Sequence, residues 1–305
     1  MIEKEYLEIA ITINPACEEL VTDVLFSSFD CEGVVTSTEE FKDLESINLI
    51  DNIVKGFFVN EKNLSESEIK KIIKEEYNNL LSNGCSKEYL GDWSVNIRQV
   101  ENEDWSKKWK ENWTPTKITE KITICPSWID YKKQEKELVI SIDPGAAFGT
   151  GVHPTTKLCV RALEKYMATG DKVADIGTGT GILAITASML GANDVVAIDN
   201  DGVAVKTAIE NAEINNVTNC TFSENEIYAI KDEFDFVTAN ILHNVLAEIM
   251  GELKRILKPQ GKVVLSGILN TKQDVVLDAI KQHDLEIVEL TEEEQWVAII
   301  TKKRG

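Results

Sequence analysis

The stretch that decides the fold reads Asp171-Lys-Val-Ala-Asp-Ile-Gly-Thr-Gly-Thr-Gly-Ile-Leu-Ala-Ile-Thr-Ala187, and Val195-Val-Ala-Ile-Asp199 follows it shortly. A short β-branched run ends in closely spaced glycines, and an apolar segment rich in Ala and Leu comes after them. Gly191 marks the end of the predicted helix, since glycine enters the left-handed conformation at a helix C-terminus without a Cβ clash. The stretch therefore predicts strand, glycine-rich turn, helix and strand, the first β-α-β unit of a doubly wound sheet. Such sheets bind ligands at the carboxyl ends of their strands.

The spacing of the glycines indicates which ligand this turn holds. A dinucleotide-binding turn reads G-x-G-x-x-G, and counted from Gly177 its third glycine would stand where this chain has Ile182. Asp175, just before Gly177, is an unfavourable neighbour for a pyrophosphate but a favourable one for a ligand that carries an ammonium and a sulfonium. Asp199 ends the next predicted strand, where its carboxylate can accept hydrogen bonds from both hydroxyls of a ribose. We therefore predict S-adenosylmethionine as the cofactor, with Gly177, Gly179 and Asp199 among the residues that bind it.

The composition bounds the kind of protein. With 305 residues the chain is long enough for two domains, and its net charge of −20, from 52 acidic and 32 basic residues, disfavours nucleic acid and favours basic partners. No apolar run approaches the roughly 20 residues of a membrane span, and the charged N-terminus lacks the apolar core of a signal peptide. The 6 cysteines show no C-x-x-C spacing, so neither a disulfide framework nor a metal site is predicted. These features predict a cytoplasmic protein with no direct contact to nucleic acid or membrane.

Hydrophobic periodicity divides the chain into three parts. Residues 1–100 follow the order strand, helix, strand, strand, helix, strand, which predicts a smaller, ferredoxin-like α+β domain. Residues 101–142 predict a connector, in which a polar helix precedes two strands, 118–125 and 138–142, that we expect to pair as a small hairpin. Residues 143–305 alternate strands and helices and end in two strands joined by a short turn. They predict the larger domain, a Rossmann-like α/β sheet closed by an antiparallel hairpin.

Two other functions remain open on the sequence. Lys55-Gly-Phe-Phe-Val59 resembles part of the aromatic strand motif of RNA-recognition modules, although the last aromatic residue of that motif is missing. Positions 1–100 hold 20 acidic and 9 basic residues, a net charge of −11 (9 − 20), which opposes RNA binding. A non-enzymatic RNA-binding or scaffold protein is therefore one alternative. A nicotinamide-dependent oxidoreductase is the other, and Asp175 and Ile182 disfavour it.

A second glycine-containing segment reads Asp143-Pro-Gly-Ala-Ala-Phe-Gly-Thr-Gly-Val-His-Pro-Thr-Thr156 and predicts a loop followed by a helix that starts near Pro154. The unpaired N–H groups at the start of this helix, with a threonine hydroxyl, can receive the carboxylate of the cofactor's methionine part. Phe148 can cover the adenine or the mouth of the site. His153 is a candidate base, but a histidine directly before proline in such a loop is more often structural.

Together these motifs resemble the bacterial ribosomal-protein L-eleven methyltransferase family. The resemblance extends over most of the chain and rests on the segment 143–156, the D-x-G-x-G-x-G turn, Asp199, Ala239-Asn-Ile-Leu242, Leu265-Ser-Gly-Ile-Leu269 and the tryptophan-rich connector. It implies a class I methyltransferase sheet, with cofactor contacts at Thr156, Gly177, Asp199 and Asn240. It also implies trimethylation of amino groups, on lysine side chains or the N-terminal amine, of a basic ribosomal protein that the N-terminal domain presents. The chain departs from the family at Val152, where threonine is frequent, and at His243 and Asn244, where small residues are usual.

Asn240 is the predicted catalytic residue. It ends the predicted strand 234–240 at the sheet edge where ligands bind, so its amide is expected to face the point of methyl transfer. Methyl transfer needs a neutral amine in line with the methyl group, and a lysine with a pKa of about 10.4 must first lose a proton. The Asn240 side-chain oxygen can accept a hydrogen bond from an N–H of the amine and so orient the lone pair of its nitrogen. No general base is evident in the sequence, and proton loss to water before binding is sufficient. The competing structural role of Asn240 is to cap the helix that follows.

Overall fold

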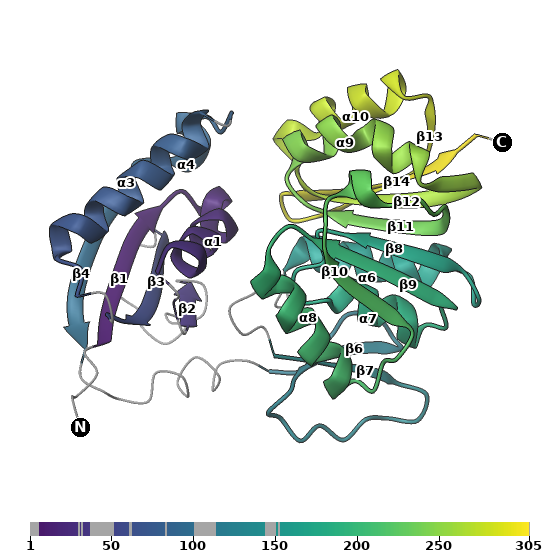
Figure 1. The fold of residues 1–305 in the computed structure, drawn as a ribbon, viewed down its shortest axis with the longest axis horizontal. Coiled ribbons are helices and arrows are strands. Elements are labelled where there is room, and N and C mark those ends of the chain that lie inside the picture. Colours follow the sequence, from purple (N-terminus) through teal and green to yellow (C-terminus); the bar gives the residue numbers. More distant parts are fainter. Residues whose placement is uncertain are drawn as a thin grey trace. The chain divides into compact units, whose positions relative to one another are not determined.

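The structure, a computed structural model, describes residues 6–29, 31, 33–36, 52–60, 63–82, 84–100, 114–143, 151 and 153–304. The chain forms two compact units, Met1–Trp113 and Thr114–Gly305 (Figure 1). The boundary between the units falls within the predicted connector. The connector helix with its tryptophans, as well as Phe148 and Val152, lies outside the described residues.

The first unit is an antiparallel sheet with α1 and α3 on one face (Figure 1). Along the chain come β1 (Tyr6–Ile13), η1 (Pro15–Cys17), α1 (Glu18–Phe29), β2 (Gly33–Thr36), β3 (Asn52–Val59), α3 (Glu66–Ser82), α4 (Lys87–Leu90) and β4 (Ser94–Val100). The strand order is β2-β3-β1-β4, and all neighbouring pairs are antiparallel. This confirms the predicted order of elements, with the short α4 as an addition before the last strand.

The alternation of side chains along the strands explains why one face of this sheet is covered. Ile9 and Ile11 of β1 are fully buried in the core between sheet and helices. Phe58 joins the same core and packs on Phe29, with ring centroids 5.4 Å apart. Phe57 is only 3% exposed. Neither Phe57 nor Phe58, the phenylalanines of the segment that resembles an RNA-recognition strand, is exposed to solvent. This burial argues against the RNA-binding alternative.

The second unit begins with a small sheet of three strands, β5 (Thr116–Lys117), β6 (Ile122–Pro126) and β7 (Leu138–Ile142). β5 and β6 are antiparallel, but β6 and β7 run parallel, with Ile122 opposite Leu138 and Pro126 opposite Ile142. The predicted hairpin between residues 118–125 and 138–142 is therefore wrong. A parallel pair needs a long connection that returns the chain to the starting end, and the residues between β6 and β7 supply it.

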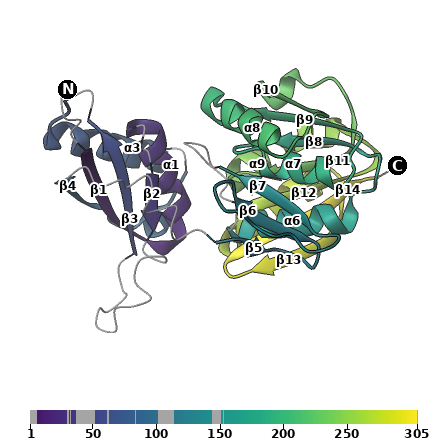
Figure 2. The same ribbon diagram turned by 90° about the horizontal axis from the view of Figure 1, so that it is seen from below.

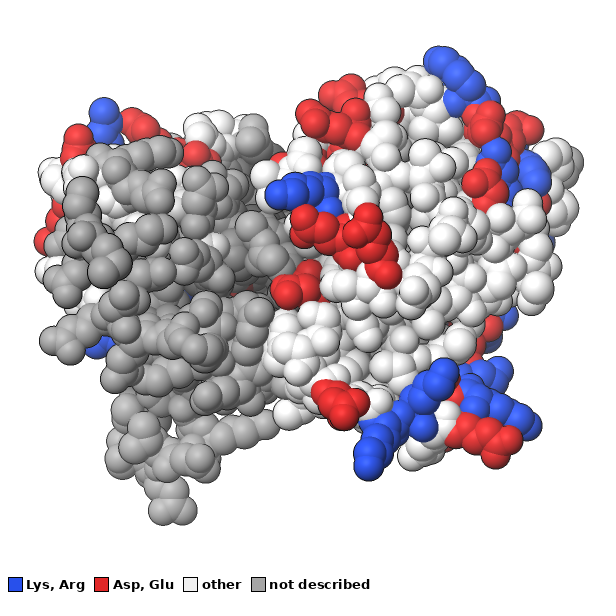
Figure 3. Space-filling view, turned by 60° about the horizontal axis from the view of Figure 1, so that its bottom comes forward, with Lys and Arg blue, Asp and Glu red and all other residues white. Residues whose placement is uncertain are grey.

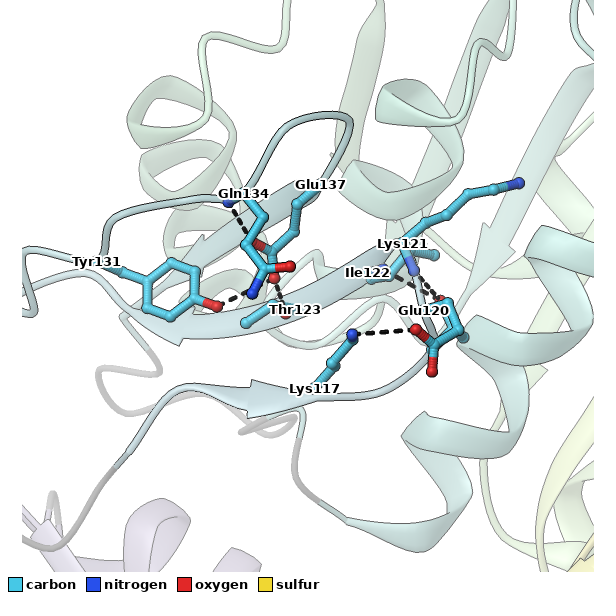
Figure 4. Close-up of polar contacts among 9 residues, drawn as sticks. Lys117, Glu120, Lys121, Ile122, Thr123, Tyr131, Gln134 and Glu137 are labelled. Carbon is cyan, nitrogen blue, oxygen red and sulfur yellow. Dashed lines mark hydrogen bonds and ion pairs between the residues drawn. The ribbon is translucent and has the colours of Figure 1, made fainter.

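Glu137 holds this returning loop together (Figure 4). The residue is 7% exposed, and its carboxylate accepts hydrogen bonds from Thr123 Oγ1 at 2.5 Å, Tyr131 Oη at 3.0 Å and the Gln134 backbone N at 2.7 Å. These donors, above all Thr123, lower the pKa of Glu137 because they stabilise its charged form. Since Glu137 directly precedes β7, the loop delivers the chain to the start of β7 in the parallel direction.

The larger sheet has seven strands in the order β10-β9-β8-β11-β12-β14-β13. Its strands are β8 (Lys172–Ile176), β9 (Asp194–Asp199), β10 (Cys220–Glu224), β11 (Phe234–Asn240), β12 (Leu257–Leu269), β13 (Leu285–Glu293) and β14 (Trp296–Lys303). The helices are α6 (Pro154–Tyr166), α7 (Ile182–Met189), α8 (Gly202–Ile214), α9 (His243–Arg255) and α10 (Gln273–Gln282), with the short turns η2 (Ile227–Ala229) and η3 (Asn270–Lys272). The strands β8 to β12 pair in parallel, and β14 and β13 add antiparallel pairs. The predicted doubly wound sheet with its closing hairpin is confirmed.

The strand order reverses between β8 and β11. From β8 the chain moves outward through β9 to β10, and it then returns to the other side of β8 with β11 and β12. α9 and α10 share a core with β8, β11 and β12, while α6 and α7 pack together (Figures 1 and 2). The carboxyl ends of β8 and β11 therefore meet at a topological switch point, the place where doubly wound sheets bind ligands.

The surface of the described residues bears on two of the predictions. No helix among them is long and apolar enough to cross a membrane. On the face drawn in Figure 3, their Lys and Arg side chains lie in small groups near Asp and Glu and form no continuous basic surface.

Candidate functional site

The glycine-rich turn between β8 and α7 lies at the switch point. Gly177, Gly179 and Gly181 have φ angles of 72°, 53° and 81°, in the left-handed region that favours glycine. The N–H groups of Gly177 and Thr178 donate to the carbonyl oxygen of Ile198 at 2.9 and 3.0 Å, which ties the turn to β9. α7 follows at once, with Gly181 at its N-cap and no side-chain cap. At a helix N-terminus without a side-chain cap, the first N–H groups have no partner within the helix and can bind a ligand.

Close neighbours also require two of these glycines. A Cβ on Gly177 would lie 2.4 Å from Ile241 Cγ2, and a Cβ on Gly181 would lie 2.9 Å from the Cβ of Ala208 in α8. Both distances are shorter than side chains tolerate without displacement. The turn therefore fits tightly between the residue that follows β11 and one face of α8.

Asp199 ends β9 beside the turn, as predicted. Its Oδ2 accepts a hydrogen bond from the Gly179 N–H at 2.9 Å, and its Oδ1 accepts one from the Asp201 N–H at 3.1 Å. An ionised carboxylate has about four lone-pair sites, so each oxygen can still accept a bond from a hydroxyl. The carboxylate and the close backbone of the glycine turn fit the ribose of S-adenosylmethionine. The bond between Asp199 and Gly179 was not predicted from the sequence.

Asp175 lies beneath the turn and is only 1% exposed. Its two oxygens accept hydrogen bonds from the hydroxyls of Thr178 at 2.7 Å and Thr238 at 2.5 Å. Burial raises the pKa of Asp175 to about 6, and the two threonine hydroxyls oppose this rise. Asp175 therefore braces the turn against β11. The prediction that Asp175 is a direct neighbour of a cationic ligand is therefore wrong. Its charge can act on such a ligand only through the turn.

Asn240 is the last residue of β11, as predicted, and it is partly exposed. Its side chain makes no hydrogen bond to another described residue. The N-cap residue of α9 is Leu242, and α9 has no side-chain cap. The competing role of Asn240 as a helix cap is therefore wrong, and its amide remains for a ligand or a substrate.

Gly267 shapes the backbone next to Asn240, a role that the sequence interpretation did not assign. Asn240 pairs with Ser266 of β12, and the Ile241 N–H donates to the Ser266 carbonyl oxygen at 3.2 Å. Gly267 has a φ of 81°, and a Cβ there would lie 2.3 Å from the Ile241 carbonyl oxygen. The register between β12 and β14 shifts at the same place. A glycine inside a strand is the signal that could have indicated this close approach.

The second predicted segment ends at the start of α6, which begins at Pro154 as predicted and packs against α7. His153 is the N-cap residue: its Nδ1 accepts a hydrogen bond from the Thr155 N–H at 3.2 Å, and its ring packs edge-on against Trp296 with centroids 4.9 Å apart. These contacts support the structural interpretation of His153. Thr156 lies in the first turn of α6 and is 2% exposed, so the predicted carboxylate contact falls at a helix N-terminus, which favours anions.

Known proteins resemble the chain over nearly its whole length. Residues 5–304 match the family described as Ribosomal protein L11 methyltransferase (PrmA). A ribosomal protein L11 methyltransferase of Brevibacillus brevis is 37% identical over 316 residues, which cover 98% of this chain and 100% of the relative. One of Clostridium perfringens is 34% identical over 98% of this chain and 99% of the relative. The crystal structure of a ribosomal protein L11 methylase from Lactobacillus delbrueckii subsp. bulgaricus matches 63% of this chain and 100% of that chain, with a TM-score of 0.61 and 30% identity.

Proposed function

The chain belongs to the ribosomal protein L11 methyltransferase family, and from this premise we propose that it methylates amino groups of ribosomal protein L11 in the cytoplasm. It is an S-adenosylmethionine-dependent methyltransferase, so the oxidoreductase and scaffold alternatives no longer apply. The observation that carries the proposal is the family match over residues 5–304, which includes both units of the structure. The acceptors we propose are lysine side chains, the N-terminal amine, or both.

The proposed cofactor site is the switch point of the large sheet. Gly177 and Gly179 bring the backbone close to the cofactor, Asp199 accepts the ribose hydroxyls, and Thr156 binds the methionine carboxylate at the N-terminus of α6. The left-handed glycine turn, the carboxylate beside it and the first-turn position of Thr156 support this assignment. The cofactor supplies a methyl group on a sulfonium, which is a good leaving group.

Asn240 is the proposed catalytic residue, and its role is to orient the substrate amine. A lysine amine with a pKa of about 10.4 loses its proton to water before it binds, so the site needs no dedicated base. The side-chain oxygen of Asn240 then accepts a hydrogen bond from an N–H of the neutral amine. This bond leaves the nitrogen lone pair directed at the methyl group. Its position at the carboxyl end of β11, its freedom from capping α9 and the tight backbone at Gly267 support this role. Positioning of this kind acts mainly on the chemical step.

The variant Asn240→Ala tests this assignment. Its kcat is expected to fall at least about tenfold, while the Kd for S-adenosylmethionine rises by a smaller factor, because Asn240 is also expected to contact the cofactor. Asn244→Ala is the matched control, because Asn244 is an exposed asparagine in the first turn of α9 and should give wild-type values of both constants. Wild-type turnover in a folded Asn240→Ala variant would remove Asn240 from the catalytic step.

For the first unit we infer a role in presenting the protein substrate. The net charge of −11 over positions 1–100 (20 acidic and 9 basic residues) suits a basic partner, and the residues proposed to bind the cofactor all belong to the second unit. A protein of residues 114–305 is therefore expected to bind the cofactor and to methylate ribosomal protein L11 far more slowly than the full chain does. An intact rate in the shortened protein would contradict this role.

The decisive experiment incubates the full chain with purified ribosomal protein L11 and labelled S-adenosylmethionine. Intact mass measurement is expected to show the L11 substrate gaining one or more methyl groups, and peptide mapping then identifies the amines. If ribosomal protein L11 stays unmodified while another ribosomal protein is methylated, the proposed substrate is wrong.

A further inference from the structure

Two asparagines, Asn211 of α8 and Asn215 at the C-cap of this helix, hydrogen-bond to β7 where a neighbouring strand could pair. β7 is an edge strand of the small sheet, and α8 packs against it (Figure 1). Asn215 accepts a hydrogen bond from the Ser141 N–H at 2.8 Å and donates to the Ser141 carbonyl oxygen at 2.6 Å. One helical turn earlier, Asn211 accepts from the Asp143 N–H at 2.8 Å and donates to the Asp143 carbonyl oxygen at 2.9 Å. The two amides thus satisfy alternate residues along this edge, as a paired strand would.

Asn211 makes one further contact that reaches the glycine-rich turn. Its Nδ2 also donates to the Thr180 carbonyl oxygen at 3.0 Å. Asn211 is 1% exposed, and Ala208, on the same side of α8, is the residue against which Gly181 packs. In contrast, the second hydrogen bond that Asn215 donates returns to the last turns of α8, to the Asn211 carbonyl oxygen at 2.8 Å. Of the two asparagines, only Asn211 connects β7 to the turn through these bonds.

We propose that Asn211 is a positioning residue of the cofactor site, because its buried amide ties Asp143, the residue that follows β7, to the Thr180 carbonyl oxygen of the glycine-rich turn. This inference rests on the proposed function, which assigns the turn to the ribose side of the cofactor. A loop binds a ligand tightly only when its conformation is set before the ligand arrives. Asn211 supplies that support to the turn from α8.

The variants Asn211→Ala and Asn215→Ala form a matched pair for the test. Each removes one amide from the edge of β7, and both are expected to lower the midpoint of thermal unfolding. Only Asn211→Ala also removes the bond to Thr180. The Kd for S-adenosylmethionine, measured by isothermal titration, is expected to rise at least about tenfold in Asn211→Ala and less than about twofold in Asn215→Ala. At saturating cofactor, the kcat of Asn211→Ala is expected to stay within about twofold of wild type, since the loss falls on cofactor binding.

A third variant, Asn211→Asp, separates hydrogen bonding from packing. Aspartate keeps the shape of the side chain and the acceptor for the Asp143 N–H, but it has no donor for the carbonyl oxygens of Asp143 and Thr180. If the donated bonds set the geometry, its Kd rises by at least about tenfold as well.

The results separate this inference from the assignment of the site itself. Asp199→Ala is the reference variant, and if it leaves the Kd for S-adenosylmethionine unchanged, the proposed cofactor site is wrong and the role of Asn211 falls with it. If Asp199→Ala raises the Kd but Asn211→Ala and Asn215→Ala change it equally, only the positioning role is overturned. A wild-type Kd in Asn211→Asp would overturn it too.

Discussion

Replacing Asp175 with asparagine should make the protein increasingly stable relative to wild type as the pH rises. The Asp175 carboxyl has a pKa of about 6 in the folded protein, raised by burial from an ordinary value of 3.8. A carboxyl with a higher pKa in the folded state binds more protons there than in the unfolded state. The free energy of unfolding therefore falls as the pH rises from about 3.8 to about 6. Asparagine is neutral at every pH, so the variant does not suffer this loss.

The size of the effect follows from the two pKa values. At about 1.36 kcal/mol for each pH unit between them, the charged carboxylate costs about 3 kcal/mol at pH 7, and roughly half of that cost is already present at pH 5. The changed hydrogen bonds to Thr178 and Thr238 shift the stability of the variant by a similar amount at both pH values. The difference in free energy of unfolding between Asp175→Asn and wild type should therefore increase by roughly 1 kcal/mol from pH 5 to pH 7.

Urea unfolding of both proteins at a series of pH values measures this difference directly. Thr238→Val is the control in the opposite direction, because it removes a hydroxyl that lowers the pKa of Asp175. Its stability should fall with rising pH more than that of wild type does. A difference between Asp175→Asn and wild type that stays constant with pH would refute the argument, since the carboxyl would then have the same pKa in both states.

Other variants test the residues around the turn. Asp199→Ala should raise the Kd for S-adenosylmethionine roughly ten- to hundredfold in isothermal titration, because acceptors for the ribose hydroxyls and for the Gly179 N–H disappear together; an unchanged Kd would exclude Asp199. Gly267→Ala should lower the free energy of unfolding by about 2 kcal/mol and also lower kcat, because the new Cβ displaces the Ile241 carbonyl beside Asn240; a folded variant with wild-type kcat would contradict this. His153→Ala should lose about 1 kcal/mol of stability, whereas His153→Asn, whose side chain is a good N-cap, should keep most of the turnover. Abolished turnover in His153→Asn would instead point to the imidazole as a base.

The glycine-rich turn could be predicted because its information is local. The run of glycines after a β-branched strand requires left-handed backbone wherever it occurs, and Gly177, Gly179 and Gly181 all adopt it. Asp199 and Asn240 were predicted at strand ends, and the parallel order of β8, β9 and β11 brings those ends to one edge. The prediction needed only the type and order of elements.

The remaining contacts could not be predicted because they join residues distant in the sequence. The position of Asn211 in its helix does not distinguish it from any other buried polar residue. Nothing in the neighbouring sequence indicates that it bonds to Asp143 and Thr180. The sequence gives no sign that Asp175 is buried under Thr238. The direction of β7 depends on the loop that Glu137 organises, and two short strands close in sequence are otherwise expected to form a hairpin.

Ile182, which stands where a dinucleotide-binding turn has its third glycine, also has a packing role of its own. In a dinucleotide-binding turn the third glycine lets helix and strand pack closely. Here Ile182 is 3% exposed, and a Cβ on Gly151 would lie 2.5 Å from its Cδ1 and 2.8 Å from Ile124 Cγ2. Gly151 has a φ of 84°, so it meets both the conformational and the spatial requirement of this contact. In a dinucleotide-binding turn the close approach occurs at the third glycine. In this chain Gly151 approaches closely instead, and the side chain of Ile182 fills the space. Ile182→Gly would therefore leave a cavity beside Gly151, and it would not create a dinucleotide site.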